Sequence, residues 1–373
     1  MAFILSVLIF SFCIPFASLT PNKASTRTTS ASQPAQPTSN MSSLDIQTSH
    51  FGTTSDTNES VTLYTITNSR SAQDGRLVDV VLGFENFTGY EKNDAYLGFI
   101  VGRVCNRIKN GQYTLDNHTY HLPITNGPNH LHGGFKGFSR RVWEKKAVGQ
   151  DFITFEYFSP DGEEGYPSAV RAAVTYRFPD NATKLIIEFD VINEGNETTP
   201  ISMTSHCYFD LGGVDRANGT IRDHTLTIHS DTYLPTDANH LVTGEIRSVA
   251  NTPYDLRSPA SLDERLDQLL PELGYDAHFC SPVSSTPKLL AVLSCPTTGI
   301  SMSVSSTQPG VQIYTAQYMN EPGGKYGRDY GKHSGIAMET QHYPDAVNHP
   351  HFPPVWLQPG EKYHHVAIYE FSI

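Results

Sequence analysis

The chain has 373 residues, of which 38% are hydrophobic and 11% aromatic, so it contains enough apolar material for a substantial core. Its formal charge is −12 at pH 7, with 26 Lys and Arg against 38 Asp and Glu. Because nucleic-acid binding requires concentrated basic residues and the sequence has no basic cluster, we expect no nucleic-acid partner.

The N-terminal residues 1–20, MAFILSVLIFSFCIPFASLT, form an apolar run that ends near the small residues Ala17 and Ser18. This pattern is typical of a signal peptide, although no Lys or Arg precedes the run. The run is shorter than the ~20 residues that a transmembrane helix needs. The sequence therefore predicts a secreted, extracellular protein without stable membrane insertion once the peptide is removed. An internal anchor and a buried N-terminus are the alternatives.

Sequons for N-glycosylation support export, because several occur in one chain. They lie at Asn40, Asn58, Asn86, Asn117, Asn181, Asn196 and Asn218. A signal peptide together with these sequons predicts a glycoprotein.

Removal of the leader would leave four cysteines, Cys105, Cys207, Cys280 and Cys295. This number is too small for a disulfide-dense scaffold, so an apolar core must stabilise the fold. Free buried thiols and a single bridge are equally compatible with the sequence.

Residues 21–58 are rich in Ser, Thr, Pro, Gln and Asn and nearly lack large apolar side chains. Such a composition cannot compensate the entropy of ordering the chain, and it predicts a flexible linker. The globular domain is then expected over residues 59–373.

Strand signals dominate this domain, as alternating, β-branched or aromatic runs bounded by turn residues. The clearest runs are residues 170–178, 184–193, 224–230, 311–319 and 364–373. One helix is predicted at residues 259–270, where leucines recur at a spacing of three to four. No βαβ alternation or repeat is present. The sequence predicts an all-β fold, a large and mainly antiparallel β-sandwich with long polar loops.

Polar or ionisable groups stand beside apolar strand-like runs in several segments. These segments are GRVCNRI (102–108), NHLHGG (129–134), TSHCYFDLGG (204–213), GYDAHF (274–279), PGVQIYT (309–315) and GIAMETQHYPDAVNHPHFPP (335–354). Each one alone has a structural interpretation, such as a satisfied core histidine, a buried ion pair or a tight turn at paired glycines. Loops on a rigid sheet are nevertheless where functional sites concentrate.

A metal site is one interpretation of the histidine pairs His130-x-His132 and His349-x-His351, because strand spacing points both imidazoles to one side. The carboxylate that such a site needs shortly after the first pair is absent, and more than two hundred residues separate the pairs. We therefore expect no metal.

Taken together and in this order, the segments resemble those of the aldose 1-epimerases (galactose mutarotases), over about residues 60–373. The resemblance implies a large β-sandwich and an isomerase that interconverts the α and β anomers of hexoses such as galactose and glucose. The reaction requires no redox step, so no cofactor is expected, and the partner is a small aldose. The resemblance does not set the oligomeric state, for which we expect a monomer.

Anomer exchange requires a base that removes the proton of the C1 hydroxyl and an acid that protonates the ring oxygen. By resemblance, Glu339 is the general base and His206 the general acid, held on opposite sides of the substrate. Arg107 is expected to help keep Glu339 ionised. The resemblance implies substrate contacts for Asn106, Arg107, His132, Asp276 and Gln312, and it assigns no chemistry to His342, His349 and His351.

Three departures from the family pattern stand out. Ser205 and Asp210 replace asparagines, and Ala277 replaces the histidine that follows the substrate-binding aspartate, with His278 one place later. Upstream, between residues 68 and 75, the chain is about two strands shorter than the family, through a genuine deletion or an incorrect gene sequence. The predicted site residues all lie outside that segment.

Two alternatives to an aldose 1-epimerase are considered. A non-catalytic carbohydrate-binding relative would need Arg107, His132 and Asp276 but neither Glu339 nor His206. A relative that acts on sugar phosphates would need cations near the site, and the segment GKYGRDYGK (324–332) offers some.

Overall fold

The computed structural model describes residues 6–7, 45–67, 78–179, 182–217, 219–269, 271 and 273–373. The predicted signal peptide, apart from two residues, and most of the predicted linker lie outside these ranges, as do Asn40, Asn181 and Asn218. No helix in the described ranges is long and apolar enough to cross a membrane.

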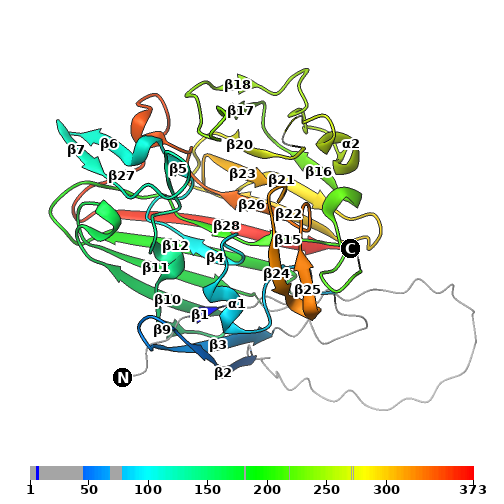
Figure 1. Cartoon of the computed structure of the whole chain (residues 1–373), viewed down its shortest axis with the longest axis horizontal. Helices are drawn as coiled ribbons and strands as arrows, with labels where there is room; N and C mark the ends of the chain where they lie inside the picture. Colours follow the sequence, from blue (N-terminus) through cyan, green and yellow to red (C-terminus); the bar gives the residue numbers. More distant parts are fainter. Residues whose placement is uncertain are drawn as a thin grey trace, which may run out of the picture.

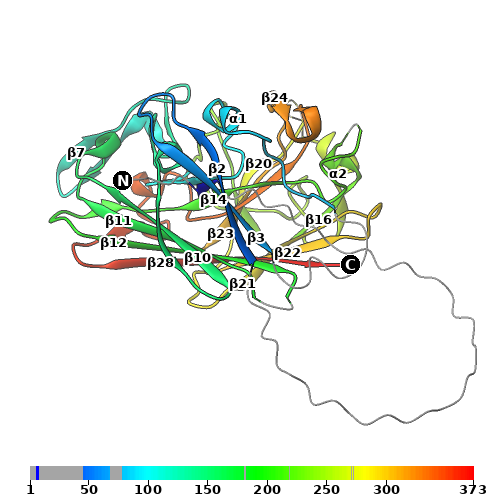
Figure 2. The ribbon, with the colours of Figure 1, turned by 90° about the horizontal axis from the view of Figure 1, so that it is seen from below.

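The larger of two main sheets has nine antiparallel strands, which Figures 1 and 2 show as one broad curved layer. In spatial order they are β19 (Ala260–Ser261), β16 (Thr225–Ile228), β21 (Lys288–Ser294), β22 (Ser301–Ser306), β28 (Lys362–Ser372), β12 (Lys184–Asn193), β11 (Val170–Arg177), β10 (Phe152–Ser159) and β9 (Glu144–Val148). Four of the predicted strands belong to this sheet, so the predicted mainly antiparallel architecture is confirmed.

The second sheet has six strands and contains parts of four of the polar segments, 204–213, 274–279, 309–315 and 335–354. In spatial order the strands are β15 (Tyr208–Phe209), β26 (Ile336–Thr340), β23 (Gly310–Tyr314), β20 (Asp276–Cys280), β17 (Thr232–Leu234) and β18 (Arg247–Ser248).

Alternation along β20, β23 and β26 divides their side chains between two faces. Phe279, Ile313 and Met338 enter the same core cluster as Phe189 and Val304 of the nine-stranded sheet. The two sheets therefore pack face to face as a sandwich. The opposite face of the six-stranded sheet points away from this core and is covered by loops and short strand pairs.

Smaller elements complete the chain. The paired strands are β6 (Gln112–Leu115) with β7 (His118–His121), β5 (Arg107–Ile108) with β8 (His130–Leu131), β4 (Phe99–Val101) with β14 (Thr204–His206), β13 (Thr199–Pro200) with β27 (Trp356–Leu357) and β24 (Glu321–Gly324) with β25 (Arg328–Tyr330). The helical turns are α1 (Phe87–Glu91), α2 (Leu262–Leu266), η1 (Lys109–Gly111), η2 (Phe138–Arg140), η3 (Glu163–Gly165), η4 (Ile221–Asp223), η5 (Lys325–Gly327) and η6 (Ala346–Asn348).

Two predictions differ from the structure in the type of element. The helix expected at 259–270 is only α2, because Ala260 and Ser261 instead pair with β16 as β19. Residues 45–53, placed in the linker by their composition, form β2 (Asp45–Thr53) in a three-stranded sheet with β3 (Ser60–Thr67) and β1 (Ser6–Val7). Ile46 and Phe51 supply the apolar contacts that the average composition of the segment concealed.

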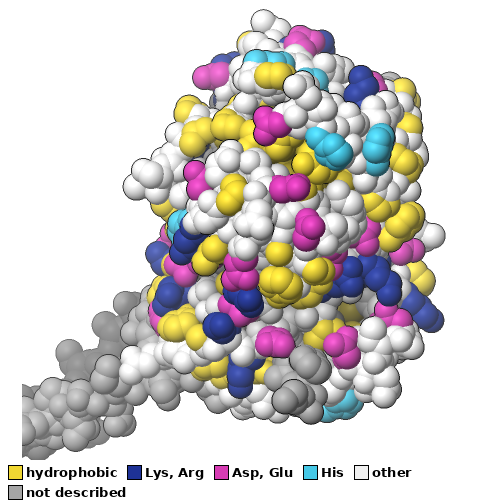
Figure 3. Space-filling model, turned by 90° about the vertical axis from the view of Figure 1, so that its left-hand side faces the viewer, with side chains coloured by type: hydrophobic (Ala, Val, Ile, Leu, Met, Phe, Trp, Pro, Cys, Tyr) yellow, Lys and Arg dark blue, Asp and Glu magenta, His cyan; other side chains and the backbone are white. Residues whose placement is uncertain are grey.

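All four cysteines in the described part of the chain are buried free thiols, so the disulfide alternative is wrong. Figure 3 shows one side of the molecule, on which acidic and basic side chains are interspersed with hydrophobic ones. That face shows no continuous basic surface.

Candidate active site

Three neighbouring strands align three of the predicted site residues. Gln312 of β23 lies directly opposite Glu339 of β26, and Asp276 of β20 lies opposite Tyr314, two residues from Gln312 on the same face. Residues paired in this way have Cβ atoms only ~5 Å apart. The register of three strands far apart in sequence thus places Asp276, Gln312 and Glu339 on one surface.

His206 reaches the same surface from the adjacent strand β14. This strand pairs with β4, with His206 opposite Phe99. The Nε2 atom of His206 lies 3.5 Å from Oε1 of Glu339, and both side chains are almost completely buried. The imidazole is packed among aromatic rings, 5.9 Å from Tyr96 and 5.0 Å from Tyr208 between ring centroids.

Asn106, Arg107 and His132 form one wall of the site, where β5 pairs with β8. Asn106 and His132 have positive φ angles of 63° and 52°, a conformation that is uncommon for non-glycine residues but least so for Asn, Asp and His. The backbone N–H of Asn106 donates to Nδ1 of His132 at 3.2 Å. In neutral His132 the proton therefore lies on Nε2, which makes Nε2 a hydrogen-bond donor.

A series of hydrogen bonds and one ion pair links this wall to the sheet. Arg107 donates through Nε to Asn126 at 3.0 Å, and its NH1 lies 3.6 Å from Oδ2 of Asp276. Gln312 donates to the other carboxylate oxygen of Asp276 at 2.7 Å. Each contact fixes a side chain that would otherwise rotate, as a preorganised binding site requires.

All seven predicted site residues line a single cavity of about 390 Å³, a size typical of small-molecule sites. The predicted juxtaposition is therefore present. One expectation needs correction, because Glu339 and His206 are neighbours rather than being on opposite sides of a substrate. This arrangement suits anomer exchange, since the C1 hydroxyl and the ring oxygen are both bonded to C1.

Burial controls the protonation of this pair. It raises the pKa of Glu339 well above its ordinary value, with a further increase from Asp276, whereas Arg107 acts in the opposite direction. Burial also lowers the pKa of His206 to about 4. Arg107 lowers the pKa of Glu339, as expected, but desolvation of the buried carboxylate raises this pKa by more, so the net shift disfavours ionisation. Burial therefore favours the uncharged form of both groups, with a proton on Glu339 and none on His206.

Several residues of the cavity were not predicted. Tyr96, Asn126, Tyr314, Tyr318 and Glu321 also line it. Most of them lie in loops whose position no periodic pattern reveals. The aromatic and amide residues beside the recognisable segments were the only signal in the sequence.

The His278 side chain lies on the same face of β20 as Asp276, and Ala277 points to the core. Both ring nitrogens of His278 are buried without a hydrogen-bond partner in the described part of the chain, and burial lowers its pKa to about 3. His278 is therefore neutral, and it does not line the cavity.

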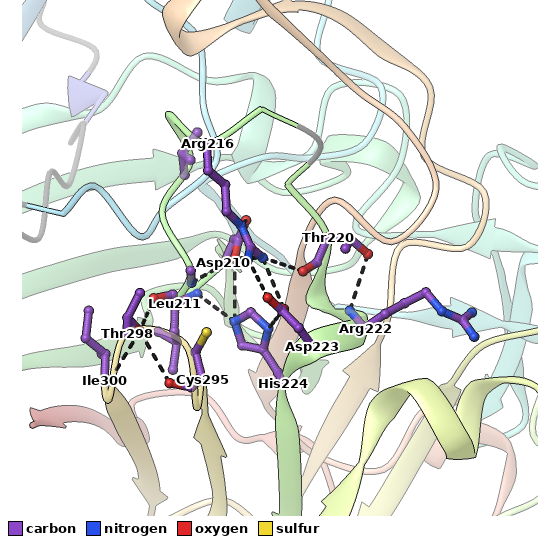
Figure 4. Close-up of polar contacts among 12 residues, drawn as sticks. Asp210, Leu211, Arg216, Thr220, Arg222, Asp223, His224, Cys295, Thr298 and Ile300 are labelled. Carbon is purple, nitrogen blue, oxygen red and sulfur yellow. Dashed lines mark hydrogen bonds and ion pairs between the residues drawn. The ribbon is translucent and has the colours of Figure 1, made fainter.

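Among the residues that the structure describes, two groups have the spacing of metal ligands: His132 with His206 and Glu339, and Asp223 with His224 and Cys295. In the first group Nδ1 of His132 accepts the N–H of Asn106 and Nε2 carries the proton, so neither nitrogen has a free lone pair. In the second, His224 uses Nδ1 towards Asp223 at 2.8 Å, and Nε2 accepts the N–H of Leu211 at 2.9 Å (Figure 4). These hydrogen bonds oppose metal coordination, which needs an imidazole nitrogen with a free lone pair.

The histidine pairs considered as ligands in the sequence have other partners. His130 hydrogen-bonds to the carbonyl of Pro123 and to Tyr166, so it is a satisfied core histidine. His351 contacts the carbonyl of Gly244, and His349 lies 3.4 Å from Asp345.

The departure at Asp210 has a local explanation. Asp210 accepts from the backbone N–H of Gly212 and from the guanidinium of Arg216, which also pairs with Asp223 (Figure 4). A carboxylate at this position is therefore matched by a cation in the following loop. The other departure, Ser205, contacts the thiol of Cys207.

Comparison with known proteins defines the class first. A family model described as aldose 1-epimerase matches residues 65–370, and the chain belongs to this family. Among curated proteins, it is 43% identical to galactose mutarotase of Bos taurus over 300 residues, which cover 80% of this chain and 85% of the relative. It is 34% identical to aldose 1-epimerase of Haemophilus influenzae, covering 74% and 79% of the two chains.

Solved structures agree in fold. The GalM/aldose epimerase homologue from C. elegans matches with a TM-score of 0.73 at 30% identity, covering 83% of this chain and 91% of that one. Galactose 1-epimerase from Lactobacillus acidophilus matches with a TM-score of 0.74 at 24% identity, covering 88% and 99%. The predicted fold class is confirmed.

Proposed function

We propose that this protein is an aldose 1-epimerase that interconverts the α and β anomers of hexoses, with Glu339 as general base and His206 as general acid. The observation that carries the proposal is the 3.5 Å approach of His206 Nε2 to Glu339 Oε1 within one hexose-sized cavity. Membership of the aldose 1-epimerase family supports the reaction class.

In the productive state the shared proton lies on His206 and Glu339 is ionised. Oε2 of Glu339 is buried and has no partner in the described part of the chain, so it can accept the proton of the C1 hydroxyl. His206 transfers its proton to the ring oxygen, the bond between C1 and that oxygen breaks, and the aldehyde forms.

Rotation about the C1–C2 bond turns the opposite face of the aldehyde towards the ring hydroxyl. On closure, that hydroxyl returns a proton to His206 and the carbonyl oxygen takes one from Glu339. The two groups end in their starting states, so the cycle is balanced. Each proton transfer to or from a positioned side chain contributes about 10²–10⁴-fold.

The surrounding residues orient the sugar. Asp276 and the Oε1 atom of Gln312 accept hydroxyl protons, and Arg107, Asn106 and His132 supply donors. Neutral His132 donates through Nε2 because its Nδ1 is occupied by the backbone of Asn106. Such preformed donors stabilise the oxygen on which charge develops.

Polarimetry of freshly dissolved α-D-glucose and α-D-galactose tests the proposal. The wild type should accelerate mutarotation, whereas Glu339→Gln and His206→Asn should approach the buffer rate. Equal rates for all three proteins and the blank would contradict it. A non-catalytic carbohydrate-binding protein, the other candidate, would bind sugar in all three forms without accelerating mutarotation.

We further propose that the protein is exported and glycosylated, and that it acts as a monomer. Asn58, Asn86, Asn117 and Asn196 are exposed, which glycosylation requires, although Asn86 also caps α1 by accepting from Gly89. Expression in a eukaryotic secretory host should give a protein in the medium whose mass falls on treatment with an N-glycosidase. Light scattering checks the monomer.

A further inference from the structure

The wall of the cavity formed by residues 94–96 and 318–321 contains a carboxylate without an assigned role. Glu321 begins β24, is 9% exposed and lines the cavity. Its Oε1 accepts the backbone N–H of Ala95 at 2.9 Å, which ties the two segments together. Glu321 thus links the two segments of this wall and also lines the substrate space.

Positive charge is scarce in this cavity. Arg107 is the only Lys or Arg among the lining residues, which include Asp94, Asp276, Glu321 and Glu339. Arg107 is already shared with Asp276. Oε2 of Glu339 and Oε1 of Gln312 are both buried and lack a partner in the described ranges, so the floor also offers acceptors.

Glu321 makes no ion pair within the described part of the chain. The nearest candidate, Arg140, donates to the carbonyls of Glu91 and Asn93 and lies 3.6 Å from the exposed Asp94. Burial raises the pKa of Glu321, whereas the backbone N–H groups of Ala95 and Asp94 lower it. These backbone groups carry no net charge, so a ligand that carries a positive charge would supply the ion-pair partner that Glu321 lacks in the described residues.

The basic segment at 324–332 does not supply a cation either. Lys325 is buried, with Nζ 2.9 Å from Asp79 and 2.9 Å from the carbonyl of Val81. Arg328 donates to the carbonyl of Val214. Neither residue lines the cavity. These two basic side chains, which suggested a sugar-phosphate substrate, instead hold neighbouring segments of the fold together.

We propose that Glu321 is a further substrate-contacting residue that selects aldoses by charge: the site accepts neutral and amino-substituted aldoses and rejects uronic acids and sugar phosphates. This inference rests on the proposed epimerase function. A carboxylate wall pairs with hydroxyl or ammonium donors. An anionic substituent would meet like charge and lose its hydration without gaining a partner.

The test compares kcat/KM for D-galactose, D-galactosamine and D-galacturonic acid by NMR anomer exchange, with buffer rates subtracted. At roughly pH 6 the amine is protonated, because its pKa lies above this value. Galactosamine should react within about tenfold of galactose, and galacturonate should be slower than galactose by more than about tenfold.

The variant Glu321→Gln keeps an acceptor for Ala95 but removes the charge. It should raise the galacturonate-to-galactose ratio by about 5- to 10-fold and lower the galactosamine-to-galactose ratio. The control Glu264→Gln, which changes an exposed glutamate of α2 outside the cavity, should leave both ratios unchanged.

Unchanged ratios in Glu321→Gln would overturn the role of this residue, and wild-type turnover of galacturonate at the galactose rate would overturn charge selection. Absence of turnover on galactose itself would instead overturn the proposed function. Calorimetric binding of galactosamine and galacturonate to the same proteins would still decide the charge preference in that case.

Discussion

Strands β12 and β26 lie in different sheets and differ in the burial of their polar residues. Along β12 the buried apolar residues alternate with partly exposed ones such as Glu188, which lies 3.7 Å from Arg177. All five residues of β26 are buried, including Glu339. On β12, solvent hydrates the charges, but on β26 loops cover the polar face and exclude solvent.

This difference separates stability from function. A charge on the open face of β12 has little energetic consequence, whereas a carboxylate on the covered face of β26 is destabilised and acquires a shifted pKa. Such a residue is typical of an active site. Changes on the core side of the sandwich should therefore affect stability, and changes on the covered polar face should affect catalysis.

The largest effect is expected for the proton-sharing pair. Glu339→Gln and His206→Asn should each reduce kcat by about 10²–10⁴-fold. Because the two groups transfer protons in one event, the double variant should lose little more than the worse single variant. Steady-state kinetics on galactose measure this, and multiplication of the two single losses would show that the residues act independently.

A substitution in the core of the nine-stranded sheet should lower stability and leave kcat unchanged. Phe189 of β12 is fully buried, so Phe189→Ala should lower the free energy of unfolding by about 3–5 kcal/mol. The kcat per folded molecule should remain unchanged. Urea denaturation and active-site titration check both. The control Ile192→Ala, on the same strand but 42% exposed, should cost much less.

Glu339→Gln should also stabilise the protein. Burial raises the pKa of Glu339 in the folded state, so ionisation disfavours folding above the ordinary glutamate pKa of ~4.3. The gain, on the order of 1–3 kcal/mol at neutral pH, should disappear below about pH 4, where the carboxyl is protonated in both states. Calorimetry at two pH values measures it, with Glu188→Gln of β12 as the matched control. A lower melting temperature for Glu339→Gln would contradict this expectation.

The acid limb of the pH–activity profile should lie at a lower pH than an ordinary histidine would give. In the proposed mechanism the pair of Glu339 and His206 is inactive when it binds a second proton, and burial lowers the pKa of His206 to about 4. The acid limb of kcat/KM is thus expected near pH 4 rather than near the ordinary histidine value of ~6.5. An acid limb at 6.5 would show that His206 is solvated in the working enzyme.

Much of the fold could be predicted because local patterns determine it. The run 184–193 is β12 with the same bounds, and 170–178 differs from β11 by one residue. The failures have physical causes. The helix at 259–270 lost its first residues to strand pairing, and the composition of 21–58 averaged over β2.

The site was predictable in identity but not in geometry. The resemblance identified Asp276, Gln312 and Glu339 as site residues. Strand register, which no local pattern specifies, places them side by side. The effect of Arg107 on the pKa of Glu339 was predicted in the right direction, but the larger effect of burial was not, because the sequence shows the cation and not the desolvation. Glu321 was missed since its position depends on how two loops meet.

We propose that Glu339 exchanges a proton with the C1 hydroxyl oxygen of the sugar and that His206 exchanges one with the ring oxygen. Two-dimensional NMR exchange spectroscopy of D-galactose at anomeric equilibrium measures this directly, without net conversion. The wild type should give strong cross-peaks between the α and β signals, and folded Glu339→Gln should give only those of the buffer. Strong cross-peaks with the variant, or none with the wild type, would contradict the account.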